Sequence, residues 1–205
     1  AVVALELARL DAVPDQEEHL DRIELETERL NDMIGDLLNM AKLETQQDHS
    51  HWALVDCGVI LDQVVEDARF EHPDSLIHLT LAADLPKVFG DARLLMSAFE
   101  NITRNALLHT HSGTSVDLSA RVKDQSLRIV IRDHGPGVPE DKLTDLLRPF
   151  VRVETSRARL GEGHRGFGLG LAIAHRVVSH HRGQIELKNH REGGLMAVID
   201  LPLDV

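Results

Sequence analysis

The chain has 205 residues, of which 42% are apolar, and a formal net charge of −12. This acidic balance argues against a nucleic-acid partner, because neutralising phosphates requires clustered Lys and Arg. No apolar run reaches the ~18 residues of a membrane-spanning helix, so we expect no membrane contact from these residues. The single cysteine, Cys57, excludes a disulfide framework and fits a reducing compartment.

The first 48 residues have the spacing of a helical bundle. Between residues 20 and 41 apolar side chains recur at intervals of three and four, which is typical of a coiled-coil seam. A shorter stretch with the same spacing precedes Pro14, which cannot lie inside a helix, and Asp15 can cap the helix that follows. One hairpin cannot bury such a seam alone, so the pattern predicts a homodimer through it; the alternative is an amphipathic helix packed on its own domain.

A polar linker, residues 44–51, leads to the rest of the chain, so we predict two domains, 1–48 and 49–205. In the second domain, spacings of three and four predict helices and strict alternation predicts strands. The predicted helices span 55–70, 94–108 and 168–180, and the predicted strands span 77–82, 115–122, 127–133, 184–188 and 196–201. Helices combined with a mostly antiparallel sheet indicate a two-layer α+β sandwich.

Two segments of the second domain carry side chains suited to a nucleotide. Asn101 and Asn105 are four residues apart on a predicted helix, so both amides project from one face, and an amide oxygen suits Mg²⁺. Asp133 ends a predicted strand, where its carboxylate can accept a hydrogen bond from an exocyclic amine, and Gly135 and Gly137 allow a close backbone approach. Taken singly, the first pair also fits a solvated helix face and the second segment a turn.

Two further segments follow along the chain. Phe150 and Arg152 open a polar stretch, where Phe150 would anchor a loop and Arg152 would meet a phosphate; a loop with a buried Phe is the alternative. A glycine-rich run then leads into a helix, whose free N–H groups attract anions. Its G-x-G-x-G spacing differs from a dinucleotide fingerprint and from a Walker loop, and a flexible loop is the alternative. The run comprises Gly166, Phe167, Gly168, Leu169 and Gly170.

Chance does not explain why these four segments occur together in this order and spacing. Together they resemble the N, G1, F and G2 boxes of sensor histidine kinases of two-component systems, within the wider GHKL (Bergerat) ATPase family that includes gyrase. Residues 105–110 (Asn-Ala-Leu-Leu-His-Thr) and 148–152 (Arg-Pro-Phe-Val-Arg) are most similar to the Cpx-type envelope-stress sensors. The resemblance implies a Bergerat ATP-binding fold, preceded by a truncated helical hairpin of a dimeric four-helix bundle, the partial dimerisation and histidine-phosphotransfer domain.

The resemblance also implies an activity, namely Mg-ATP binding and transfer of the γ-phosphoryl group to a histidine, for relay to an Asp of a response regulator receiver domain. By similarity Asn105 would hold Mg²⁺, Asn101 would lie beside the phosphates and Asp133 would bind the adenine amine. Residues 151–165 would form the ATP lid. The other implied site residues are Gly135 and Gly137 at the adenine, His109 and Phe150 near the nucleotide, Gly166, Gly168, Leu169 and Gly170 at the phosphates, and Arg152 and Arg165 toward the γ-phosphate.

Asn101 and Glu100 bear on the class of reaction. Hydrolytic relatives carry a Glu four residues before the metal-binding Asn, and this Glu acts as the general base. The resemblance places Asn101 at that position, and an Asn side chain cannot take a proton. Phosphoryl transfer is therefore favoured over ATP hydrolysis. Glu100 is turned about 100° around the helix from Asn101, and would either assist the acceptor imidazole or have a structural role.

Two departures from the family pattern qualify these expectations. None of the 13 histidines has the His-Glu/Asp-x-x-x-Pro setting of a phospho-acceptor, so we expect the acceptor upstream of residue 1. Leu108 stands where many relatives carry Lys or Arg, which favours a second interpretation, a nucleotide-free dimeric interaction module. A hydrolytic ATPase of the gyrase type is the third. The resemblance further implies the cytoplasmic portion of a bacterial inner-membrane sensor.

Overall fold

The computed structural model describes residues 51–110, 113–152 and 167–203, and near the N-terminus residues 19, 20, 23, 27, 30, 34 and 35. The chain divides into two compact units, Ala1–Lys42 and Leu43–Val205. The described residues of the first unit are helical, and most of the predicted hairpin lies outside the described residues. No helix in the described part is both long and apolar enough to cross a membrane.

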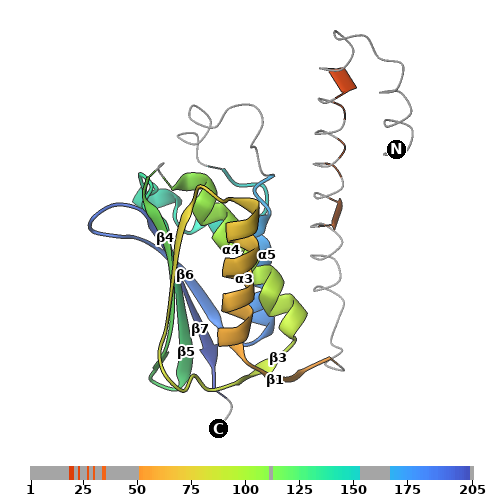
Figure 1. The fold of residues 1–205 in the computed structure, drawn as a ribbon, viewed down its shortest axis with the longest axis vertical. Coiled ribbons are helices and arrows are strands. Elements are labelled where there is room, and N and C mark those ends of the chain that lie inside the picture. Colours follow the sequence, from red (N-terminus) through yellow and green to blue (C-terminus); the bar gives the residue numbers. More distant parts are fainter. Residues whose placement is uncertain are drawn as a thin grey trace. The chain divides into compact units, whose positions relative to one another are not determined.

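A five-stranded mixed sheet forms one layer of the second unit (Figure 1). Among the described strands, the β2–β4 pair is parallel and the other three neighbouring pairs are antiparallel, as the sequence predicted. The strands in spatial order are β2 (Leu76–Leu81), β4 (Ser115–Lys123), β5 (Ser126–Arg132), β7 (Leu195–Pro202) and β6 (Gln184–Asn189).

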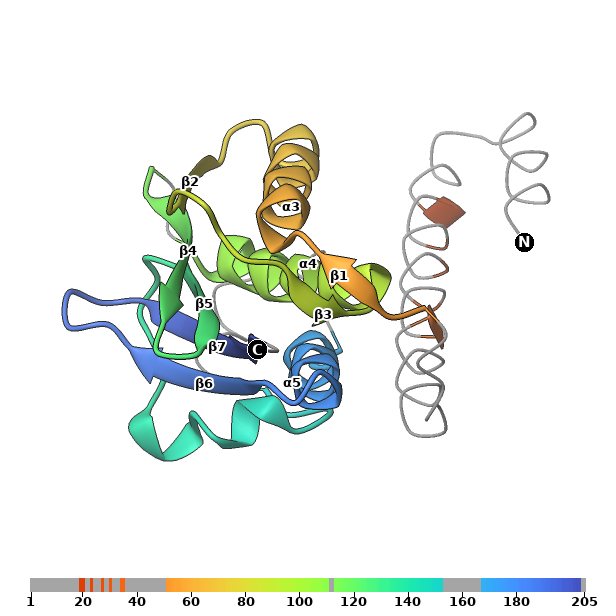
Figure 2. The same ribbon diagram turned by 90° about the horizontal axis from the view of Figure 1, so that it is seen from below.

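Three helices cover one face of this sheet, α3 (Cys57–Glu71), α4 (Ala92–His109) and α5 (Gly170–His180) (Figures 1 and 2). Alternate residues of the strands and one stripe of each helix form the core between the two layers. The predicted α+β sandwich is therefore confirmed. The central contributions come from Leu95, Phe99, Ile102 and Ala106 of α4 and from Leu127, Ile129 and Ile131 of β5.

The helix starts differ in how they are capped. Asp56 and Asp91 precede α3 and α4, and each accepts hydrogen bonds from two backbone N–H groups of the first turn. The cap at Asp56 explains why α3 begins later than predicted. Leu169 precedes α5 and provides no side-chain cap for the N–H groups of the first turn.

A small second sheet lies near the starts of α3 and α4. This end of the helical layer is opposite the start of α5. It pairs β1 (Ala53–Val55) with β3 (Val88–Gly90), two strands too short to show alternation in the sequence. Nearby, buried His181 accepts a hydrogen bond from Asp91 N through Nε2 (3.0 Å), and Nδ1 donates to Val177 O (2.8 Å). This imidazole links the start of α4 to the end of α5 and so fixes the two helices that carry most of the predicted site.

Two 3₁₀ helices connect β5 to the segment that begins at Arg148. They are η1 (Glu140–Lys142) and η2 (Asp145–Leu147), and η2 packs beside α5. The described start of the polar segment after them lies beside the glycine-rich run, since Phe150 N donates to Gly168 O.

Candidate nucleotide-binding site

Asp133 follows β5 and is only 3% exposed. Its Oδ1 accepts hydrogen bonds from Gly135 N (2.7 Å) and Leu195 N (3.1 Å). Its Oδ2 has no hydrogen-bond partner among the described residues. One oxygen thus fixes the carboxylate and the other is left as an acceptor, an arrangement that fits the exocyclic amine of adenine.

Close packing of backbone surrounds this carboxylate. A Cβ at Gly135 would collide with the carbonyl of His109, and a Cβ at Gly194 with the carbonyl of Asp133. Gly137 has φ 72°, and its Cβ would lie 2.7 Å from Asn189 Oδ1. The glycines predicted at this position are therefore required by contacts within the chain, whatever ligand is bound.

Asn101 lies against the start of α5. A Cβ at Gly170 would approach Asn101 Oδ1 to 2.8 Å, and Asn101 Nδ2 donates to Ser97 O at 2.9 Å. The predicted N box and glycine-rich run therefore meet, although 69 positions of sequence separate them. Asn105, one turn further along α4, is half-buried, and its amide has no partner among the described residues. An amide oxygen near an uncapped helix start suits a metal-bound phosphate.

His109 and Arg152 lie between these two halves. Burial lowers the pKa of His109, Asp133 opposes this effect and Arg152 adds to it, so all three charges act within one site. Arg152 also lies beside the glycine-rich run, because its Cγ would be 3.2 Å from a Cβ at Gly168. A guanidinium at this place provides a local positive charge, which the acidic chain needs if it is to hold phosphates.

The side chain of Phe150 does not form the predicted anchor. The sequence predicted an anchor through its ring, yet the residue is 57% exposed. The contact is made by the backbone instead, since Phe150 N donates to Gly168 O at 3.0 Å. Phe150 has φ 64° and Gly168 φ 75°, so the two left-handed residues form the junction together.

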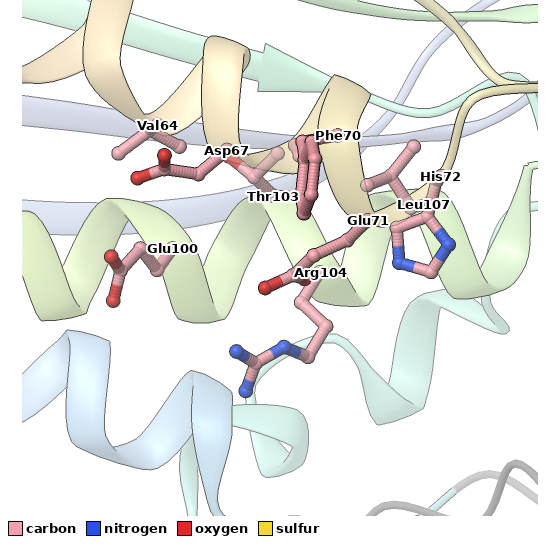
Figure 3. A pocket seen from close by; sticks show the side chains of 10 residues that line it. Val64, Asp67, Phe70, Glu71, His72, Glu100, Thr103, Arg104 and Leu107 are labelled. Atoms are coloured by element: carbon pink, nitrogen blue, oxygen red, sulfur yellow. The ribbon is translucent and has the colours of Figure 1, made fainter.

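Three further residues of the prediction, Arg165, Gly166 and Glu100, have no described place in this site. Arg165 and Gly166, with most of the predicted lid, are outside the described residues. Glu100 and Arg104 line a groove between α3 and α4 (Figure 3). They therefore occupy a different side of α4 from Asn101, as the turn of about 100° per residue requires.

Other residues that support the loop after Asp133 were not found from the sequence. Asn189, at the end of β6, donates to Val138 O (2.6 Å) and accepts from Val138 N (2.9 Å), which fixes the loop after β5. His134 Nε2 lies 2.8 Å from Asp117 Oδ2. Burial raises the pKa of Asp117, but hydrogen bonds from His134 and Ser115 outweigh it and hold that pKa below its usual value. Only the strand register brings these residues together, and no local motif marks them.

Residues 90–205, from the end of β3 to the C-terminus, match the family described as "Histidine kinase-, DNA gyrase B-, and HSP90-like ATPase". The chain belongs to this family. The match includes Asn101, Asp133 and the start of α5. The resemblance that the four segments predicted is confirmed.

Named relatives of this ATPase domain are sensor kinases. The chain is 33% identical over 192 residues to the sensor histidine kinase CpxA of Escherichia coli (strain K12), covering 92% of this chain and 40% of CpxA. It is 38% identical over 136 residues to the histidine-protein kinase BaeS of the same strain, covering 66% of this chain and 26% of BaeS. A solved chain of the mycobacterial sensor histidine kinase MprB is 27% identical to this chain, with a TM-score of 0.63, covering 74% of this chain and 97% of that solved chain. The chain thus spans less than half the length of its curated relatives.

Proposed function

We propose that the chain is the catalytic region of a sensor histidine kinase, which binds Mg-ATP and transfers the γ-phosphoryl group to a histidine. The observation that carries this proposal is the contact between Asn101 and Gly170. It brings the amide of Asn101, on α4, to a helix start that has no side-chain cap. Backbone N–H groups and the helix dipole at such a place favour the phosphates of a nucleotide.

The adenine would bind at Asp133. The free Oδ2 would accept a hydrogen bond from the exocyclic amine, while Oδ1 stays fixed by Gly135 and Leu195. The neutral form of His109, favoured by its lowered pKa, would lie beside the nucleotide. Gly135 and Gly137 would shape the adenine pocket.

The phosphates would bind at Gly168, Leu169 and Gly170. Asn105 would hold Mg²⁺ through its amide oxygen, with phosphate oxygens and water as the other ligands. When bound, Mg²⁺ would neutralise charge on the phosphates. Arg152 would supply a second positive charge from the polar segment, and Arg165 and Gly166 are proposed for the same region from the sequence alone.

Asn101 favours transfer over hydrolysis. An amide cannot take a proton from water, whereas the carboxylate of a hydrolytic relative can. Catalysis would then consist of positioning the γ-phosphate and stabilising its charge. We do not assign Glu100 to the reaction, because its side chain lies in the groove between α3 and α4.

The remaining parts of the proposal concern partners. The phosphoryl group would pass from the histidine to an Asp of a response regulator receiver domain, and the kinase would be the cytoplasmic part of a bacterial inner-membrane sensor. The helical unit would form a homodimer; Ile23, Leu30 and Ile34 share the bundle spacing and are each at least half exposed, which supports this proposal.

Calorimetry with and without Mg²⁺ tests the nucleotide site. Wild-type protein should bind Mg-ATP, and Asn105→Ala should lose the part of the affinity that depends on Mg²⁺ while keeping metal-free ADP binding. Unchanged Mg-ATP affinity in this variant would refute the metal assignment. Failure of the wild-type chain to bind any adenine nucleotide would instead favour the interaction module. Phosphate release by the chain alone, well above background, would favour the hydrolytic ATPase.

A further inference from the structure

The loop after β5, residues 133–138, is attached at both of its ends to the β6–β7 hairpin (Figure 2). At its start, Asp133 N donates to Leu195 O at 3.0 Å, and Asp133 Oδ1 accepts from Leu195 N. At its end, Val138 N donates to Asn189 Oδ1 at 2.9 Å, and Asn189 Nδ2 donates to Val138 O at 2.6 Å. Asn189 and Leu195 are direct partners in the register of β6 and β7, so one pair of residues holds the two ends of the loop.

Asn189 carries both of the groups that this attachment needs. A carboxamide presents a donor and an acceptor, so it pairs with the carbonyl and the N–H of Val138 as the backbone of a neighbouring strand would. Its Oδ1 also packs on the backbone of Gly137, where an added Cβ would lie 2.7 Å away. An Ala side chain would offer neither group, and an Asp side chain would offer acceptors alone.

The composition of the loop makes an outside attachment necessary. Gly135 and Gly137 lose more conformational freedom on ordering than other residues do. Gly137 has φ 72°, and Pro136 between the two glycines is exposed. The two hydrogen bonds from Asn189 therefore offset part of the entropy cost of ordering the loop, at the end that lies farther along the chain from β5.

The turn that follows Asn189 is itself braced. His190 N donates to Gly194 O at 2.9 Å and Gly193 N donates to His190 O at 3.0 Å, which closes the turn. Arg132, the last residue of β5, donates to Gly193 O at 3.4 Å. A side chain can hold another segment in place only if its own backbone is fixed, and the hairpin meets this condition.

We propose that Asn189 is a positioning residue for adenine binding, a role that rests on the proposed function of the site. It acts through Val138 and holds residues 133–138 in the conformation in which Asp133 Oδ2 faces the adenine amine. The pocket is then formed before the nucleotide arrives, so binding does not have to order the loop. Without Asn189 the loop would be in place in only a fraction of the molecules, and the apparent affinity would fall by that fraction.

Calorimetry of the whole chain with ADP, in the absence of Mg²⁺, tests this role. Asn189→Ala removes both hydrogen bonds to Val138, and the Kd for ADP should rise about tenfold. Gln184→Ala is the matched control, because Gln184 is an exposed amide at the other end of β6, and it should bind ADP as the wild type does. In the nucleotide-free protein, the amide of Val138 should exchange faster in Asn189→Ala than in the wild type or the control.

A double-mutant cycle separates positioning from a general structural role. Asn189→Ala is measured in the wild-type background and in an Asp133→Asn background, which lacks the adenine-binding carboxylate. If Asn189 acts by positioning Asp133, its loss should weaken ADP binding by less than about twofold in the second background. Asn189→Ser keeps one hydroxyl for the backbone of Val138, so its ADP affinity should lie between those of the wild type and Asn189→Ala; melting curves establish that each variant is folded.

Three results would overturn the role of Asn189. One is wild-type ADP affinity in folded Asn189→Ala, or in folded Asn189→Ser if the Ala variant does not fold. Another is an equal loss from Asn189→Ala in both backgrounds, because Asn189 would then act on something other than the adenine contact. The third is unfolding of both Asn189 variants at the assay temperature, which would assign this side chain to the fold. Failure of the wild type to bind ADP would instead overturn the proposed function on which the role rests.

Discussion

Replacing Asp133 by Asn separates adenine recognition from stability. The Asn carbonyl would keep both hydrogen bonds that Asp133 Oδ1 accepts, from Gly135 N at 2.7 Å and Leu195 N at 3.1 Å. Its NH₂ group would replace Oδ2 and meet the adenine amine donor to donor. A lost charge-assisted hydrogen bond is worth about 1.5–3 kcal/mol, so the Kd for ADP should rise about 10- to 150-fold. Asp133→Ala is less informative, because two buried N–H groups left unpaired would cost about 2–6 kcal/mol of folding free energy.

The assay is calorimetry with ADP in the absence of Mg²⁺, together with thermal unfolding. Asp62→Asn is the matched control, because Asp62 is exposed on α3. We expect the control to bind ADP like the wild type and Asp133→Asn to remain folded with weakened binding. A folded Asp133→Asn variant with wild-type ADP affinity would refute the adenine assignment.

Two further predictions concern the same site. Gly170→Ala places a Cβ 2.8 Å from Asn101 Oδ1, so ATP affinity measured by calorimetry should fall by about tenfold or more; unchanged affinity would contradict the assignment of Asn101 and Gly170 to the phosphates. Asp117 has a lowered folded pKa, so its contribution to stability is present above its unfolded pKa and is lost as the pH falls through the folded pKa. Urea unfolding should show Asp117→Asn less stable than the wild type at pH 7, by under about 1 kcal/mol because Asp117 is partly exposed, with the difference shrinking in acid; a pH-independent difference would contradict the role of the carboxylate.

The sequence predicted the parts of the fold that rest on periodic burial. The strands alternate because one face of the sheet meets the helices, as Leu127, Ile129 and Ile131 illustrate, and α4 buries the stripe that its spacing indicated. Asn101 and Asp133 were found because their segments follow a family pattern in order and spacing. The structure adds that Asn101 reaches the start of α5 and that one oxygen of Asp133 has no partner among the described residues.

The rest depended on contacts between distant residues. β1 and β3 are too short to leave a pattern, and only their antiparallel pairing in the structure identifies them. Asn189 supports the loop after β5 only because β6 ends beside it in this register. The exposure of the Phe150 ring follows from its backbone bond to Gly168, which no composition rule indicates. Contacts between residues distant in sequence therefore determine these features, which local sequence patterns do not indicate.

The central claim is that this site transfers a phosphoryl group to a histidine. The direct measurement is incubation of the chain with γ-labelled Mg-ATP and a separate helical domain that carries the acceptor histidine of a related sensor kinase. The account predicts acid-labile, base-stable label on that histidine, reduced at least about tenfold with Asp133→Asn and absent when the acceptor histidine is replaced by Gln. Intact Mg-ATP binding with no label on the acceptor domain would contradict the claim.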